Sequence, residues 1–158
     1  MRRLLFWAMP ACAAAGAGGL PLPDPLDITA AAAGRPGNAK LLAPGFLDLA
    51  PDIVAPVYPL DAATLFDALL AVGQGMERWF LAASYPSRLQ AHFVARSARL
   101  NFPDLVMVEA RACDDVGAAP VVFSRSVHGR LDFGVNLRRL RAFSDALDRK
   151  VATMMAKD

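Results

Sequence analysis

Three side chains of the types needed for hydrolysis lie close together in the chain: Ser126, His128 and Asp132. A serine nucleophile, a histidine base and an orienting carboxylate form the triad used in acyl transfer. On one strand, the serine and the histidine would point the same way, with their Cα atoms about 7 Å apart. However, neither a nucleophile elbow nor a glycine-rich oxyanion loop precedes the serine. We therefore expect a non-catalytic binding or structural domain, and a hydrolase using these three residues is the alternative.

Arginine dominates the basic residues in the second half of the chain. The whole sequence has 17 basic and 15 acidic residues, and its net charge of +2 is too small to indicate nucleic-acid binding. Between residues 76 and 141, ten arginines stand against six acids, which leaves +4. A planar guanidinium makes paired hydrogen bonds to carboxylates and phosphates. We therefore expect the partner to be an anionic ligand, a lipid or an envelope protein, bound near Arg96, Arg125, Arg130, Asp132, Asn136 and Arg139.

Cysteine and histidine are too sparse to predict a metal site. The chain has two of each (Cys12, Cys113, His92 and His128), and none has a partner at the spacing of zinc ligands. We expect neither a metal nor a cofactor. Because the basic residues are not interleaved with aromatic residues, we do not expect a nucleic-acid partner either.

The first nineteen residues have the order of a signal peptide or membrane anchor. Residues 1–3 (Met-Arg-Arg) are positive, residues 4–9 (Leu-Leu-Phe-Trp-Ala-Met) are apolar, and an alanine-rich stretch follows. This order is typical of secretory signals and predicts cleavage after Ala15 or Ala17. The sequence before Cys12 has a weak likeness to a lipoprotein box, which makes Cys12 a candidate for lipidation. We expect an exported protein of the periplasm or cell envelope. A cleaved signal, a lipid anchor and an uncleaved anchor all stay open.

Composition divides the remaining chain into two parts. Residues 20–52 are rich in proline, glycine and alanine. Such a segment buries too little surface to offset its ordering entropy, so we expect an arm or tether there. Residues 53–158 carry helix and strand patterns and have a length that suits one domain. Because 55% of all residues are apolar, a disordered chain is excluded, and we expect a single α+β domain over 53–158.

Hydrophobic periodicity over residues 53–158 predicts five strands and two helices. Asp61 is a helix N-cap, and apolar residues at helical spacing predict a second, longer helix over 135–155. The candidate strands alternate or are rich in β-branched residues, and they span residues 53–58, 79–85, 88–97, 105–112 and 121–127. Pro56 confines the first strand to a sheet edge, and the short links require antiparallel pairing. We expect a two-layer α+β sandwich, an antiparallel meander of four to five strands with two helices packed on one face.

The segment from Ser126 to Arg139 carries a recognisable motif, Ser-Val-His-Gly-Arg-Leu-Asp-Phe-Gly-Val-Asn-Leu-Arg-Arg. It resembles the C-terminal part of the domain of unknown function 1499 family, whose pattern is Ser-x-x-Gly-x-x-Asp-Leu-Gly-Val-Asn-x-x-Arg. A looser likeness to the middle strands of that family begins at Arg96. The resemblance covers most of residues 54–147 and implies a small exported or envelope protein without an assigned activity.

The same motif also has a purely structural interpretation. It lies where the last strand becomes the long helix, so Asp132 is placed to cap the first amides of that helix. Gly134 permits a backbone geometry that other residues resist, and Asn136 is placed to bond the neighbouring loop. We expect these three residues to fasten the helix to the sheet.

Overall fold

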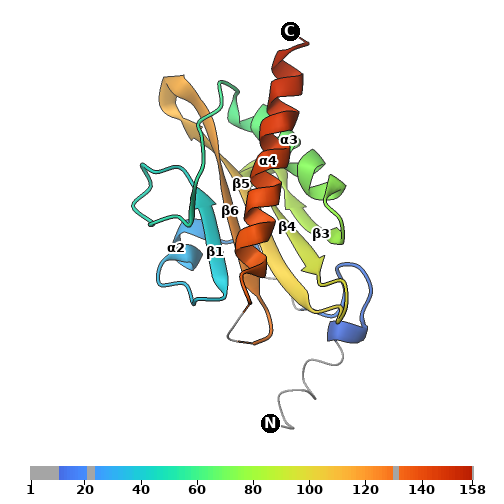
Figure 1. The fold of residues 1–158 in the computed structure, drawn as a ribbon. Coiled ribbons are helices and arrows are strands. Elements are labelled where there is room, and N and C mark those ends of the chain that lie inside the picture. Colours follow the sequence, from blue (N-terminus) through green and yellow to red (C-terminus); the bar gives the residue numbers. More distant parts are fainter. Residues whose placement is uncertain (1–10, 21–23, 130–131, 158) are drawn as a thin grey trace.

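A six-stranded sheet forms the centre of the molecule (Figure 1). The computed structural model describes residues 11–20, 24–129 and 132–157. The strands lie in the order β2-β1-β6-β5-β4-β3, and all neighbours are antiparallel except the parallel pair of β1 and β2. The strand bounds are β1 Ala39–Ala43, β2 Ile53–Val54, β3 Trp79–Tyr85, β4 Gln90–Arg96, β5 Pro103–Cys113 and β6 Gly117–Ser126. The predicted α+β class is confirmed, with one strand more than expected.

Two helices cover one face of this sheet, as the sequence predicted. Helix α3 spans Ala62–Gly75, and helix α4 spans Val135–Met155. Asp61 caps α3, because its carboxylate accepts a backbone amide hydrogen bond at 2.9 Å. Under the helices, Trp79 of β3 stacks on Phe143 of α4 with ring centroids 5.4 Å apart. The alternating side chains of β4 and β5 that face this core are Ala91, Phe93, Ala95, Val106, Val108 and Ala110.

The opposite face is also covered, which corrects the expectation of a loose arm over residues 20–52. Helix α2 (Ile28–Ala32) packs there against apolar side chains of three strands, Leu41, Met107, Val121 and Phe123. Strand β1 lies between β2 and β6, so this stretch also supplies an interior strand. The average composition of residues 20–52 gave no indication of β1, a five-residue segment (Ala-Lys-Leu-Leu-Ala) in which only the lysine is not fully buried.

The first predicted strand, over 53–58, is much shorter in the structure. Strand β2 contains only Ile53–Val54, and it lies at the sheet edge to which Pro56 was expected to confine it. Beyond it, Tyr58 joins β6 through an isolated bridge. Gly117 permits this close approach, because a Cβ atom there would lie 2.0 Å from the carbonyl oxygen of Tyr58.

Residues 11–18 lie at the end of the molecule where the β4–β5 and β6–α4 connections are found (Figure 1). The β5–β6 turn and the end of α4 lie at the other end. Among the residues that the structure describes, no helix is both long enough and apolar enough to cross a membrane.

Candidate functional site

Asn136 lies at the centre of a buried polar cluster beneath the start of α4. Its Oδ1 accepts hydrogen bonds from the Ser124 hydroxyl at 2.6 Å and from the Arg139 guanidinium. Its Nδ2 donates to the Ser126 hydroxyl at 3.0 Å and to the carbonyl oxygen of Asn38 at 2.9 Å. Both hydrogens and both acceptor positions of this amide are therefore used. We define the Asn136 cluster as Asn136, Ser124, Ser126, Arg139 and Asp104.

Arg139 and Asp104 carry the charges of the Asn136 cluster. Nη2 of Arg139 donates to Oδ2 of Asp104 at 2.7 Å, and the two side chains are only 9% and 11% exposed. Nη1 of Arg139 also donates to the Ser124 hydroxyl at 3.1 Å. Buried charges are tolerated when they are paired and hydrogen-bonded, as these are. The ion pair joins α4 to β5, so this arginine acts within the fold and does not present its charge to an external anion.

Asp132 caps the first amides of α4 as the motif led us to expect, although it lies two residues before Gly134, which occupies the N-cap position itself. Its Oδ1 accepts from the Gly134 amide and its Oδ2 from the Asn136 amide, both at 3.0 Å. Burial raises the pKa of the Asp132 carboxyl, but the two amide bonds outweigh burial and lower the pKa below its usual value. Gly134 precedes the helix with φ at 73°, a left-handed conformation that glycine adopts without strain. The ionised carboxylate is thus engaged with the helix that it caps.

The structure does not assemble Ser126, His128 and Asp132 into a triad. The Ser126 hydroxyl accepts its hydrogen bond from Asn136, and Asp132 accepts from backbone amides. Nε2 of His128 has no hydrogen-bond partner in the described part of the chain. Because a serine nucleophile needs its base within hydrogen-bond reach, this geometry does not activate Ser126.

Arg96 is buried at the end of β4, with 4% of its surface exposed, and backbone carbonyls surround its charge. Nε donates to the carbonyl of Gly16 at 2.6 Å. The Nη atoms donate to the carbonyls of Ala11 at 2.8 Å and Gly18 at 2.6 Å. A fourth bond, from Nη1 to the carbonyl of Asn101, is 3.1 Å long. The guanidinium that we expected to bind a ligand therefore holds the N-terminal segment.

Asn101 holds the same segment from the β4–β5 loop. Its Nδ2 donates to the carbonyls of Cys12 at 2.6 Å and Ala14 at 3.0 Å. Nη2 of Arg78 donates to Oδ1 of Asn101 at 3.0 Å, which fixes the orientation of this amide. We call Arg96 and Asn101 the Arg96 clamp. Together they bind five carbonyl groups within residues 11–18.

The remaining predicted site residues are Arg125, Arg130 and Cys12. Arg125 is exposed near the end of β6. It points to the face opposite Ser124 and Ser126, because side chains alternate along a strand. Arg130 lies outside the described residues. Cys12 is half-buried in the clamped segment. The five predicted ligand-binding residues that the structure describes therefore do not converge on one binding site.

Cys113 does not have the properties of a reactive thiol. Burial raises its pKa, so the thiol stays protonated at neutral pH. The described residues contain no group of three or more histidine, cysteine, aspartate or glutamate side chains that could hold a metal ion.

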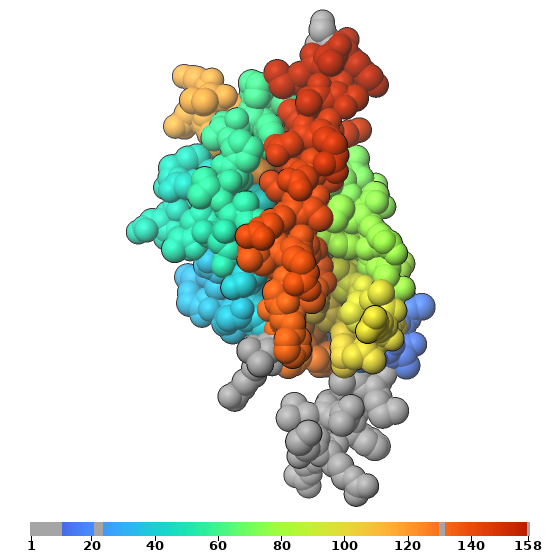
Figure 2. Space-filling model, in the orientation of Figure 1, coloured from blue at the N-terminus to red at the C-terminus, as the bar shows by residue number. Residues whose placement is uncertain are grey.

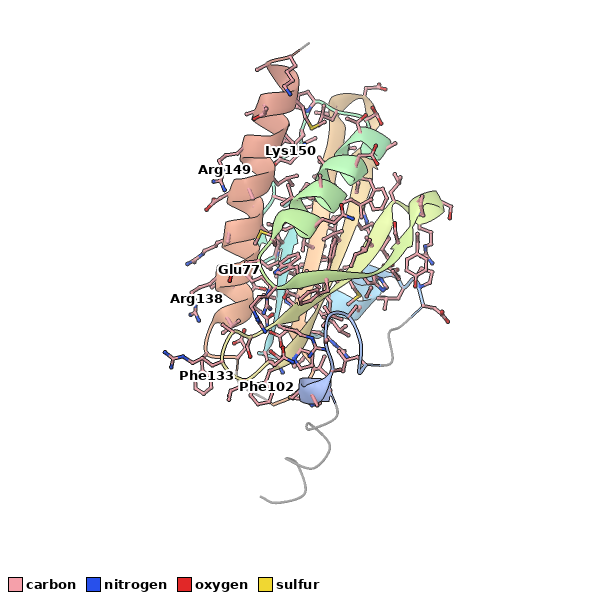
Figure 3. The ribbon with its side chains drawn as sticks, turned by 90° about the vertical axis from the view of Figure 1, so that its right-hand side faces the viewer. Glu77, Phe102, Phe133, Arg138, Arg149 and Lys150 are labelled. Atoms are coloured by element: carbon pink, nitrogen blue, oxygen red, sulfur yellow. The ribbon has the colours of Figure 1, made fainter. Side chains whose placement is uncertain are left out.

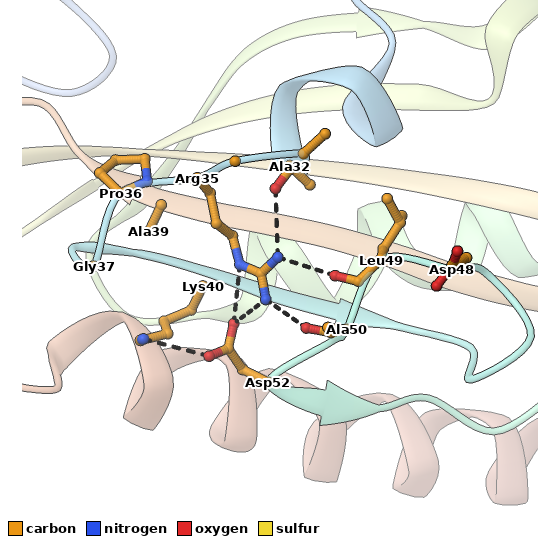
Figure 4. A pocket seen from close by; sticks show the side chains of 12 residues that line it. Ala32, Arg35, Pro36, Gly37, Ala39, Lys40, Asp48, Leu49, Ala50 and Asp52 are labelled. Carbon is orange, nitrogen blue, oxygen red and sulfur yellow. Dashed lines mark hydrogen bonds and ion pairs between the residues drawn. The ribbon is translucent and has the colours of Figure 1, made fainter.

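A cavity of about 560 Å³ lies beside α2 and β1 (Figure 4). Arg35 lines it and donates to the Asp52 carboxylate at 3.0 and 3.3 Å. The same guanidinium donates to the carbonyls of Leu49 at 3.1 Å and Ala50 at 2.6 Å, and Lys40 pairs with Asp52 at 3.3 Å. These charges are bonded to one another, so they fasten the loop before β2 to the arginine that follows α2.

Sequence reasoning missed several partners of these clusters. Ser124 lies two positions before Ser126 on β6 and therefore on the same face. The alternation of side chains along a strand would have predicted this proximity. Asp104 is paired with Ser126 across β5 and β6, and this register is set by the whole sheet. No local pattern shows that the amide of Asn101 binds a segment almost ninety residues away.

Comparison with known proteins gave no family model that matches this chain and no matching curated protein. The resemblance to the domain of unknown function 1499 family therefore stays a prediction.

Proposed function

We propose that this protein is an exported, non-catalytic binding domain of the cell envelope that stays attached to a membrane by its N-terminal segment. The hydrogen bonds made by polar side chains of the C-terminal motif support the proposal that the domain is not catalytic. Asn136 and Arg139 bond strands β5 and β6, and Asp132 caps α4. Because these groups are engaged inside the domain, the binding role belongs to the surface.

The observation that carries the attachment is the Arg96 clamp. Three of the four carbonyl acceptors of the Arg96 guanidinium belong to residues 11–18, and a hydrogen bond to a charged group of this kind contributes about 1.5–3 kcal/mol. Cleavage after Ala15 would remove the Ala11 acceptor together with both acceptors of Asn101. The folded domain therefore favours a mature chain that retains this segment. The apolar run of residues 4–9 then stays attached to it.

Peptide mapping of protein from the native host tests this attachment. Trypsin cuts after Arg3 and, because a proline follows Arg35, next after Lys40. A retained N-terminus therefore yields a peptide spanning residues 4–40, which we expect in the membrane fraction. A mature chain that begins beyond residue 15, or a protein found only in the soluble fraction, would contradict the proposal.

Two matched serine variants test the absence of catalysis. Ser126→Ala and Ser124→Ala each remove a hydroxyl that bonds Asn136, but only Ser126 belongs to the hypothetical triad. In a broad screen of ester and peptide substrates, we expect no turnover that depends on Ser126 alone. An activity that Ser126→Ala abolishes and Ser124→Ala retains would overturn the non-catalytic assignment.

A further inference from the structure

One end of the molecule combines the clamped N-terminal segment with two loops. We define the tether end as residues 11–18, the β4–β5 loop (97–102) and residues 132–138, which end the β6–α4 connection and begin α4. The β4–β5 loop and the start of α4 lie next to each other at the lower end of Figure 2. The labelled side chains of Phe102 and Phe133 lie at the same end in Figure 3.

Large apolar side chains are exposed at the tether end. Phe133 is 84% exposed, Leu100 is 64% exposed, and Phe102 is 37% exposed. Phe133 also has φ at 51°, a left-handed conformation that is uncommon for a bulky residue. A hydrogen bond from Nη1 of Arg138 to the Phe133 carbonyl, at 3.0 Å, and the cap formed by Asp132 hold this conformation. The fold thus maintains an uncommon backbone conformation at a residue whose aromatic ring is exposed to solvent.

The charge around these apolar side chains is positive. Residues 96–104 and 125–139 contain six arginines, of which Arg130 lies outside the described residues, Arg139 is neutralised by Asp104, and Arg96 is buried against backbone carbonyls. Three of these arginines, Arg99, Arg125 and Arg138, are exposed. The turn between β5 and β6 at the opposite end carries Asp114 and Asp115 instead. A surface that is both basic and apolar is complementary to an anionic bilayer.

The first described residue, Ala11, lies at this same end. The apolar run of residues 4–9 lies between Arg3 and the clamped Ala11. Six residues rise only about 9 Å as a helix, against about 30 Å for the bilayer core. A run of that length suits the depth of about 5–10 Å reached by interfacial segments.

We infer that the tether end docks on the surface of an anionic bilayer, with Phe133, Leu100 and Phe102 at the level of the lipid headgroups. This inference rests on the proposed function, because it names the surface to which the attached domain binds. The exposed arginines Arg99, Arg125 and Arg138 pair with lipid phosphates. The domain is thereby held in one orientation, with the β5–β6 turn away from the membrane.

A site-specific fluorescent label tests the orientation. The full chain carries Cys12→Ser and Cys113→Ser, with one bimane-labelled cysteine at Leu100→Cys or at Val116→Cys. Val116 is a matched control because it is 70% exposed and lies in the β5–β6 turn. With vesicles of phosphatidylcholine and phosphatidylglycerol, we expect a blue shift at position 100 and quenching there by brominated acyl chains, with no change at position 116.

Co-sedimentation of the same samples separates docking from attachment. Protein that sediments with the vesicles while the label at position 100 stays unquenched would overturn the docking and leave the attachment standing. Protein that does not sediment would overturn both. A blue shift at position 100 without vesicles, at concentrations where the protein self-associates, would assign this surface to a second copy and overturn the inference.

Single substitutions then measure each contribution to vesicle binding. Phe133→Ser should weaken partitioning about tenfold, as expected for the partial burial of one aromatic ring. Arg99→Gln should weaken it about fivefold on anionic vesicles, with a smaller effect at high salt. Arg149→Gln, which changes an exposed arginine far along α4 (Figure 3), should leave partitioning unchanged. Equal partitioning of Phe133→Ser and the wild type would overturn the docking.

Discussion

The Asn136 cluster and the Arg96 clamp are both buried polar groups, but they take their partners from different parts of the chain. The Asn136 cluster joins α4 to β5 and β6, and Asp104 neutralises its arginine. The Arg96 clamp joins the end of β4 and the β4–β5 loop to residues 11–18. The acceptors of Arg96 are uncharged carbonyl oxygens.

This difference separates residues that build the domain from residues that attach a segment to it. A broken bond in the Asn136 cluster separates elements that form the core, so it lowers the free energy of global unfolding. A broken bond in the Arg96 clamp frees a segment that opens locally, because the exposed guanidinium and carbonyls can then bond water. Variants of the Asn136 cluster should therefore lower the free energy of global unfolding, whereas variants of the Arg96 clamp should increase local opening of residues 11–18.

The largest effect is expected from breaking the ion pair of the Asn136 cluster. Arg139→Met leaves the buried Asp104 carboxylate without its counter-charge, and we expect the free energy of unfolding to fall by about 3–5 kcal/mol. Arg141→Met is the matched control, because Arg141 is exposed on the same helix. Urea denaturation measures both variants. Equal midpoints for the two would show that the ion pair does not stabilise the domain.

A smaller effect is expected at the helix cap. Asp132→Ala should lower the free energy of unfolding by about 0.5–2 kcal/mol, the range for losing an N-cap. Asp132→Asn keeps the hydrogen-bond acceptor and should lose only the charge contribution of about 0.3–1 kcal/mol. If neither variant shifts the urea midpoint, Asp132 does not have the structural role that its amide bonds indicate.

The same carboxylate predicts a pH dependence. Because its pKa is lowered in the folded state from the usual 3.8, the folded protein binds this proton less tightly than the unfolded chain. The stabilisation is therefore complete above the usual pKa and is lost as the pH falls through the lowered value. The stability difference between the wild type and Asp132→Asn should be constant near neutral pH and shrink below about pH 3.8. A difference that grows on acidification would contradict this assignment.

Much of the fold follows from local sequence patterns. The alternation along β4, the Asp61 cap and the apolar stripe of α4 each predicted an element that the structure contains. Strand β1 was missed because its five residues lie within a segment whose composition is typical of linkers. Local patterns therefore predicted elements well where the surrounding composition agreed with them.

The candidate sites were less predictable, because their partners are distant in sequence. The Asp132 cap was predictable, since all its bonds lie within four residues. The bonds of Arg96 to Ala11, Gly16 and Gly18 join positions about eighty residues apart, and only the tertiary structure brings them together. For this reason, an arginine expected to meet an external ligand proved to hold the chain itself.

Hydrogen exchange of the full chain, comparing Arg96→Gln with Arg99→Gln, tests directly whether Arg96 holds residues 11–18 on the domain. Arg99 lies in the same loop region and is exposed, so its variant controls for the loss of one charge. We expect the amide of Gly18, which donates to the carbonyl of Ala15 within the clamped segment, to exchange slowly in the wild type and in Arg99→Gln. In Arg96→Gln this amide should exchange at the rate of an unfolded peptide, while α4 stays protected in all three proteins. Equal exchange of this amide in the wild type and Arg96→Gln would contradict the claim that Arg96 holds the N-terminal segment on the domain.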